Sequence, residues 1–224
     1  MKDKITLLKV LVGSHAHGLA ESNSDKDYRA VYILPTSNIL SLGYRYKAND
    51  WIEGDEDNTA YELGHFLHLA LKCNPTILEV FKAPIIEANE DCEYLKKMFS
   101  WVWNPHDCYN AFVGYGLNQR KKFLDKKDNR QDKYACAYIR TLIALHQLLT
   151  TEDFDILVPE DYRPMLMRFK KGNYSVGEII DIAEKWTERC NLALGHCKHQ
   201  PIPSAVNSFL IDMRKKYWKI NDKI

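Results

Sequence analysis

The chain has 224 residues, of which 46% are hydrophobic, and a formal net charge of +1. This length allows one large or two small domains with a real core, and the small charge excludes a protein that is a polycation throughout. No apolar run reaches the length of a membrane span, and the stretch MKDKITLLKV lacks a signal-peptide pattern. Six scattered cysteines suit a reducing compartment. We therefore expect a cytoplasmic protein without a membrane partner.

Two apolar runs near the N-terminus enclose a loop of small and polar residues. The first run is Leu7–Val12, and the second is Tyr28–Leu34, which stops at Pro35. Short apolar runs bounded by turn residues predict strands. The sequence between them, GSHAHGLAESNSDKD, predicts a loop that contains a helical turn.

This loop combines groups that suit a polyphosphate with groups that suit a divalent cation. Gly13 allows close backbone approach, and the following peptide N–H groups and the Ser14 hydroxyl can point at an anion. On the second strand side chains alternate, so Asp25 and Asp27 project to the same face. Neighbouring carboxylates repel unless a cation lies between them, and their hard oxygen atoms favour Mg²⁺ or Mn²⁺. The alternative is an ordinary turn followed by a solvated strand face.

The stretch GSHAHGLAESNSDKDYRAVYILP resembles the signature of the polymerase-β-like nucleotidyltransferases: a strand ending in Gly-Ser, a short helix, then Asp-x-Asp on the next strand. It is most similar to the RNA-ligase-associated polymerase-β-like branch. The resemblance is sharp over residues 8–35, looser to about residue 81 and general beyond. It implies an α+β fold, in which a small mixed β-sheet carries the site. It also implies magnesium-dependent transfer of a nucleoside monophosphate with release of pyrophosphate.

The resemblance suggests roles for individual residues. Asp25 and Asp27 would hold the metal ions, and Gly13 and Ser14 would grip the phosphates of the NTP. Further candidates for nucleotide contacts are His17, Arg29 and Arg140. The His17 imidazole could donate to the triphosphate or pack on the short helix, and Arg140, within an otherwise apolar helix, could contact the triphosphate or extend to solvent.

Nucleotidyltransferases of this type usually carry a third carboxylate on a later strand. Asp57, placed before Thr59–Ala60–Tyr61, matches best as a third metal ligand and catalytic residue, and Glu62 is the competitor. The acidic run that contains Asp57 offers several registers, so both remain open.

Helical patterns follow. Apolar residues at helical spacing over 63–71 predict a buried stripe, and Asn74–Pro75 predicts an N-cap and the first position of the next helix. In the resembling branch an Asn-Pro-x-x-x-Glu stretch of this kind recurs near the site. Glu79 is therefore either a site residue or an acid on the helix surface.

Residues 101–105 mark the junction to an almost entirely helical second half. Helices are predicted over 105–124, over 132–149 and from a capping box at Ser175 through residue 194, and a last helix is predicted to be capped by Ser204. We expect a nucleotidyltransferase catalytic domain over residues 1–100 and a C-terminal helical bundle that binds the substrate over residues 101–224.

Charge is divided unevenly between these halves. Residues 1–100 contain 11 basic and 15 acidic side chains, whereas residues 101–224 contain 20 basic and 15 acidic ones. The second half is thus the better candidate for contacting a polyanion. Basic residues cluster over 120–133, where they form either an RNA-phosphate patch or a solvated loop.

These observations favour a metal-dependent nucleotidyltransferase that acts on RNA, such as a tRNA end. One alternative is nucleotidylation (AMPylation) of a protein or a small molecule, and another is a nucleotide-binding module without turnover. The sequence leaves the NTP, the use of a template and the oligomeric state undetermined.

Overall fold

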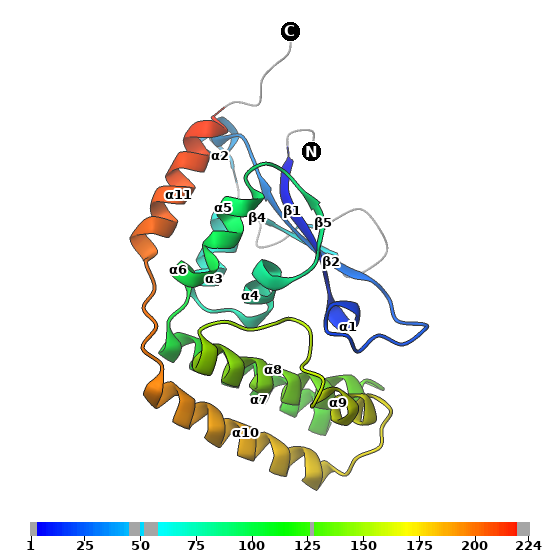
Figure 1. The fold of residues 1–224 in the computed structure, drawn as a ribbon. Coiled ribbons are helices and arrows are strands. Elements are labelled where there is room, and N and C mark those ends of the chain that lie inside the picture. The colour runs from blue at the N-terminus through cyan, green and yellow to red at the C-terminus, as the bar shows by residue number, and fades with distance from the viewer. Residues whose placement is uncertain (1–3, 45–49, 52–57, 126–127, 219–224) are drawn as a thin grey trace.

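A mixed β-sheet lies at one end of the molecule, and long helices lie at the other (Figure 1). The computed structural model describes residues 4–44, 50–51, 58–125 and 128–218. In this part of the chain the sheet has five strands in the order β3-β4-β2-β1-β5. Their bounds are β1 Ile5–Val12, β2 Asp27–Ile33, β3 Asp50–Trp51, β4 Thr59–Glu62 and β5 Ile85–Ala88. The predicted α+β fold with a mixed sheet is confirmed.

The pairing of the two central strands places the loop between them at one end of the sheet. β1 and β2 are antiparallel, and their ladder ends at the pair Val12 and Asp27. The chain turns at that point into the short helix α1, Gly13–Ala16. β4 runs parallel to β2, with Thr59 beside Arg29. Figure 1 shows α1 at the end of the sheet that faces the long helices.

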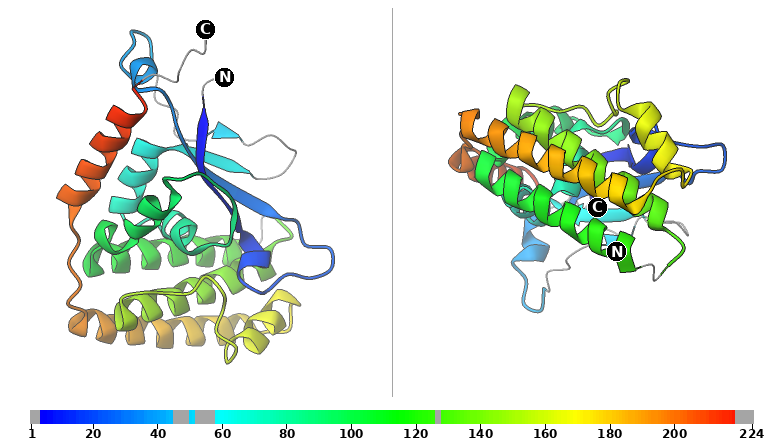
Figure 2. Two further views of the ribbon diagram at one scale, coloured as in Figure 1. Left: turned by 45° about the horizontal axis from the view of Figure 1, so that its top comes forward. Right: turned by 90° about the horizontal axis from the view of Figure 1, so that it is seen from below.

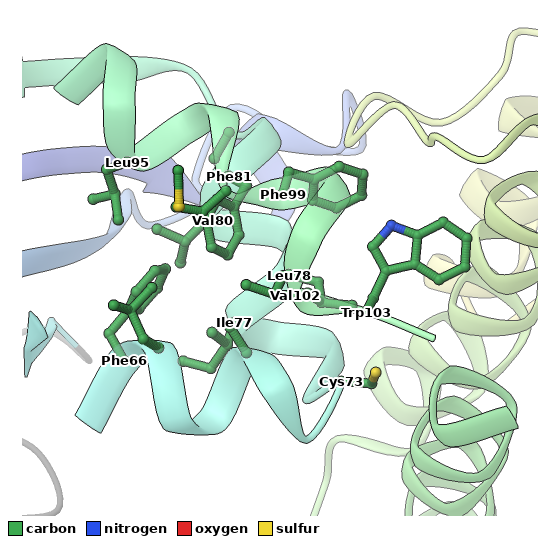
Figure 3. Packing of buried hydrophobic residues seen from close by; sticks show 14 of the residues in the cluster. Phe66, Cys73, Ile77, Leu78, Val80, Phe81, Leu95, Phe99, Val102 and Trp103 are labelled. Atoms are coloured by element: carbon green, nitrogen blue, oxygen red, sulfur yellow. The ribbon is translucent and has the colours of Figure 1, made fainter. Parts of the chain in front are cut away.

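One face of the sheet packs against helices α3 (Leu63–Leu71) and α4 (Pro75–Lys82). Val10, Val31 and Ile33 are buried with the apolar stripe of α3, as the helical spacing predicts. Asn74 caps α4 by accepting a hydrogen bond from the Thr76 N–H group at 3.0 Å, so the predicted cap is confirmed. Figure 3 shows how the side chains of α4 fill this core together with Phe66.

Aromatic rings extend this core toward the long helices. Phe81 lies between Phe66 and Phe99, with ring centroids 5.0 and 6.0 Å away, and Phe154 follows 5.8 Å from Phe99. The short helices α5 (Cys92–Lys97) and α6 (Phe99–Val102) supply part of this packing. In Figure 3 Trp103 lies at the edge of the cluster next to the bundle.

The second half is a helical bundle, as predicted. Its helices are α7 (Pro105–Asp125), α8 (Gln131–Thr151), α9 (Arg163–Lys170) and α10 (Val176–His196). Ser175 Oγ accepts a hydrogen bond from the Glu178 N–H group at 3.1 Å, which confirms the predicted cap of α10. Seen from below, α7, α8 and α10 lie side by side (Figure 2). No helix in the described ranges is long and apolar enough to span a membrane.

The last helix, α11 (Pro203–Lys216), returns to the sheet and packs near α2 (Thr36–Ile39). Arg214 donates to both carboxylate oxygens of Glu62, at 2.6 and 2.8 Å, and the Tyr217 carbonyl accepts from the Thr36 N–H group. The predicted cap at Ser204 is wrong, because Pro203 already occupies the first helical position and its fixed φ angle starts the helix there. The division into residues 1–100 and 101–224 stays a prediction.

We expect Arg214→Met to destabilise the fold by about 3 kcal/mol, because it leaves the buried Glu62 carboxylate without its counter-ion. Chemical denaturation measures this change. Lys215→Met is the control, since that neighbouring side chain is 73% exposed and should change the free energy of unfolding little. An equal effect of the two substitutions would contradict a structural role for the pair.

Candidate active site

The loop after β1 brings a bare backbone against a carboxylate. Gly13 has a φ angle of +69°, and a Cβ atom built on it would lie 2.2 Å from Oδ2 of Asp27. Only glycine fits here, because both the backbone conformation and the space exclude a side chain. The predicted phosphate-binding residue and one predicted metal ligand are thus immediate neighbours.

Asp25 and Asp27 differ in their settings. β2 begins at Asp27, so Asp25 precedes the strand and is exposed, and the prediction that both lie on the strand is wrong. A turn replaces the strand here: the Glu21 N–H group donates to Ser24 Oγ at 2.8 Å, and the Ser24 N–H group donates to the Glu21 carbonyl at 3.0 Å. Asp57, the proposed third ligand, lies outside the described residues.

The carboxylate oxygens of Asp25 and Asp27 are of the type that Mg²⁺ and Mn²⁺ prefer, and Oδ2 of Asp27 lies directly against the backbone of Gly13. Within residues 4–44, 50–51, 58–125 and 128–218, no three His, Cys, Asp or Glu side chains are grouped so as to hold a metal ion. The described residues fit a divalent cation through a partial donor set, to which bound phosphate oxygens would add.

Glu62, the other candidate for the third carboxylate, faces away from this site. It pairs in register with Tyr32, five residues along β2 from Asp27, or about 16 Å. Because side chains alternate, Glu62 shares its face of the sheet with Ala60, whereas Asp27 shares the opposite face with Arg29. Its carboxylate also accepts from the N–H group of Gly64 at 2.8 Å and from Arg214. Glu62 therefore anchors α11 and caps α3.

A buried charge cluster lies behind the loop. Glu79 on α4 accepts a hydrogen bond from Nη1 of Arg140 on α8 at 2.7 Å, and its other oxygen lies 3.9 Å from Nε2 of His17. Arg29 donates to the carbonyl of Thr76, one turn before Glu79, at 2.7 Å. The structure thus brings His17, Arg29 and Arg140 together around Glu79, and their role in nucleotide binding stays a prediction.

Burial and neighbouring charges set the protonation of this cluster. Burial alone would raise the pKa of Glu79, but Arg140, His17 and Arg29 together lower it to about 2. Burial, reinforced by Arg140 and opposed by Glu79, lowers the pKa of His17 to about 4. At neutral pH His17 is uncharged, and its Nδ1 donates to the Ile156 carbonyl at 3.1 Å. One carboxylate and two guanidinium groups leave a net positive charge behind the loop.

The sequence left open whether Glu79 is a site residue or an acid on the helix surface. The structure rejects the surface reading, since the residue is only 9% exposed. The sequence gave a partial indication that Glu79 is buried, because the residues on either side of it, Leu78 and Val80, are apolar. The partner Arg140, 61 residues away, could not be deduced from that pattern.

Substitution of Gly13 by Ala should disrupt the site. We expect a loss of about 2 kcal/mol in stability, because alanine is strained at a positive φ angle, and about a 100-fold loss of nucleotidyl transfer as Asp27 is displaced. Activity assays and denaturation measure both effects. Gly114→Ala in α7 is the control, since its Cβ would meet nothing within 4 Å, and it should retain activity and stability. Full activity of Gly13→Ala would contradict the site.

The buried, neutral His17 should make the fold sensitive to acid. The unfolded chain takes up a proton near pH 6.5 and the folded chain only near pH 4, so stability is complete above pH 6.5 and is lost as the pH falls between these values. We expect a loss of about 2 kcal/mol between pH 7 and pH 5. Denaturant titration at each pH measures it.

His17→Asn should reduce this pH dependence, because asparagine keeps a donor for the Ile156 carbonyl and does not titrate. His68→Asn on the exposed side of α3 is the control and should keep the full dependence. The same slope in all three proteins would show that His17 is not responsible.

Comparison with known proteins shows which family the chain belongs to. Residues 2–188 match the model of the family RlaP, described as "RNA repair pathway DNA polymerase beta family". No curated protein matches the chain. A crystal structure of a nucleotidyltransferase-like protein from Exiguobacterium sibiricum 255-15 aligns over 95% of this chain and 72% of that chain. Its sequence identity is 12% and its TM-score is 0.27.

Proposed function

The chain belongs to the RlaP family, the RNA repair pathway DNA polymerase beta family, and is a polymerase-β-like nucleotidyltransferase; from this premise we propose that it transfers a nucleoside monophosphate from an NTP to a hydroxyl group of RNA, such as a tRNA end. Pyrophosphate is the second product. The observation that carries the proposal is the contact between the Gly13 backbone and the Asp27 carboxylate. It joins a place for phosphates to a ligand for a divalent cation.

Gly13 and Ser14 are proposed to contact the phosphates of the NTP. Arg29 and Arg140, only partly neutralised by Glu79, supply a positive potential behind them. The side chain of Arg140 is 14% exposed while it is paired with Glu79, so the pair is largely but not completely shielded from water. His17 supports the loop through its bond to Ile156 and remains neutral.

Asp25, Asp27 and Asp57 are proposed to hold Mg²⁺ or Mn²⁺. When bound, the metal supplies Lewis-acid stabilisation of the charge that develops on the phosphates. Support for Asp57 comes from its described neighbours: Asn58 Oδ1 accepts a hydrogen bond from the Tyr28 N–H group at 2.9 Å, and Thr59 pairs with Arg29. We propose that Asp57 accepts the proton of the attacking hydroxyl group or helps to hold the catalytic metal.

An RNA acceptor is supported by the description of the family and by the excess of basic residues in the second half. Arg120, Lys121, Lys122, Arg130 and Lys133 are the described members of the basic cluster. Lys126 and Lys127 lie outside the described residues.

Asp27→Asn and Asp25→Asn should each abolish transfer, with a fall of about 1,000-fold, because each removes charge that holds the metal. Each labelled NTP is incubated with total RNA and Mg²⁺ or Mn²⁺, and both RNA and protein are resolved on gels. Asp181→Asn, exposed on α10, is the control and should keep full activity.

Retained activity in both variants would reject this site. Metal-dependent label on a protein band and none on RNA would favour the alternative acceptor, and NTP binding without pyrophosphate release would favour a binding module.

A further inference from the structure

The loop that carries Asp25 is anchored in the helical bundle, although it connects two strands of the sheet. Leu19 is buried, 3% exposed, in the bundle cluster that contains Leu166 and Phe169. The backbone N–H group of Val158 donates to the carbonyl of His17 at 3.2 Å. The loop and the bundle therefore form one packed unit at this point.

Lys170, the last residue of α9, contacts three residues of the loop. Its ammonium group donates to the Leu19 carbonyl at 2.7 Å and to Ser24 Oγ at 3.4 Å, and it lies 3.7 Å from the Glu21 carboxylate. Two of its three donors are thus used in hydrogen bonds, and the Glu21 carboxylate supplies a nearby opposite charge. The side chain is 21% exposed, so its bonds are partly shielded from water.

Ser24 connects this contact to the site. Its hydroxyl accepts from the Glu21 N–H group, and its carbonyl receives a hydrogen bond from Nε2 of His15 at 2.9 Å. Asp25 is the next residue and, being exposed and outside the strand, has no ladder bonds to hold it. Its place depends on how Ser24 is fixed.

We propose that Lys170 is a positioning residue that fixes Asp25 relative to Asp27 and so sets the affinity of the site for a divalent cation. This inference rests on the proposed function of the two aspartates. It assigns to the bundle a part in shaping the metal site of the sheet, at a lysine that makes no contact with the reacting atoms.

The test compares Lys170→Met with Lys171→Met, because Lys171 follows in the chain and is exposed. The first readout is Mn²⁺ binding, followed by electron paramagnetic resonance in the presence of a non-hydrolysable NTP analogue. We expect Lys170→Met to raise the Mn²⁺ concentration at half-saturation about tenfold and Lys171→Met to leave it unchanged. Lys170→Arg, which keeps charge and donors, should restore most of the affinity.

Hydrogen exchange of the free protein supplies a readout that needs no ligand. Amides of residues 19–25 should exchange faster in Lys170→Met, with the exchange of β1 and β2 unchanged. Transfer activity should show the same shift in metal requirement.

The inference is overturned if Lys170→Met keeps the Mn²⁺ affinity of the parent protein, or if it only lowers the melting temperature while the folded fraction binds Mn²⁺ normally. Absence of Mn²⁺ binding in the parent protein would instead refute the proposed metal site, and this inference with it. Normal binding in the parent protein and in Lys170→Met would refute the inference alone.

Discussion

The ion pair between Glu79 and Arg140 fastens the two halves of the molecule to each other behind the candidate site. Glu79 belongs to a helix packed on the sheet, and Arg140 belongs to the central helix of the bundle. A buried pair of this kind contributes little net stability, because removing both charges from water offsets most of their attraction. Its value is geometric: each charge is costly without the other, so the helices are held in one arrangement.

The loop between β1 and β2 uses that fixed arrangement. It begins on the sheet at Gly13 and passes His17 and Leu19, which lie against the bundle, before it returns to the sheet at Asp27. If the two halves moved relative to each other, the two ends of this loop would be displaced differently. The charge cluster and the packing of Leu19 therefore act on the same feature, the separation between the backbone at Gly13 and the carboxylates of Asp25 and Asp27.

Local signals in the sequence predicted the elements well. Asn74 and Ser175 cap the helices that their side chains indicated, because capping needs only neighbours a few residues away. The Gly-Ser and Asp-x-Asp pattern predicted that Gly13 and Asp27 are neighbours for a similar reason, because two adjacent strands joined by one loop bring those residues together. Asp25 was misplaced because a turn closed by Ser24 competes with the strand, and alternation alone does not show where a strand begins.

Long-range contacts escaped prediction, and they decide the character of the site. The sequence around Arg140 gives no sign of its partner Glu79, which lies 61 residues away in the chain. The sequence around Lys170 likewise gives no sign of Leu19, which lies 151 residues away. The orientation of Glu62 could not be predicted from its local sequence either. Only the register of the sheet and the ion pair with Arg214 reveal that Glu62 faces away from Asp27. A sequence pattern identifies the charged and polar side chains that could take part in a site, whereas the contacts between them depend on how the helices and strands pack.

Charge balance connects these contacts to the chemistry. A triphosphate is strongly anionic, and Asp25 and Asp27 repel it, so the net positive charge left by Glu79, Arg29 and Arg140 is too small to hold it alone. Binding of the nucleotide and of the metal should therefore depend on each other, because each supplies the charge that the other lacks. A site that kept the arginines and lost the carboxylates would bind a triphosphate without placing it for transfer. The carboxylates consequently distinguish an enzyme from a binding protein here, and the arginines behind them serve both.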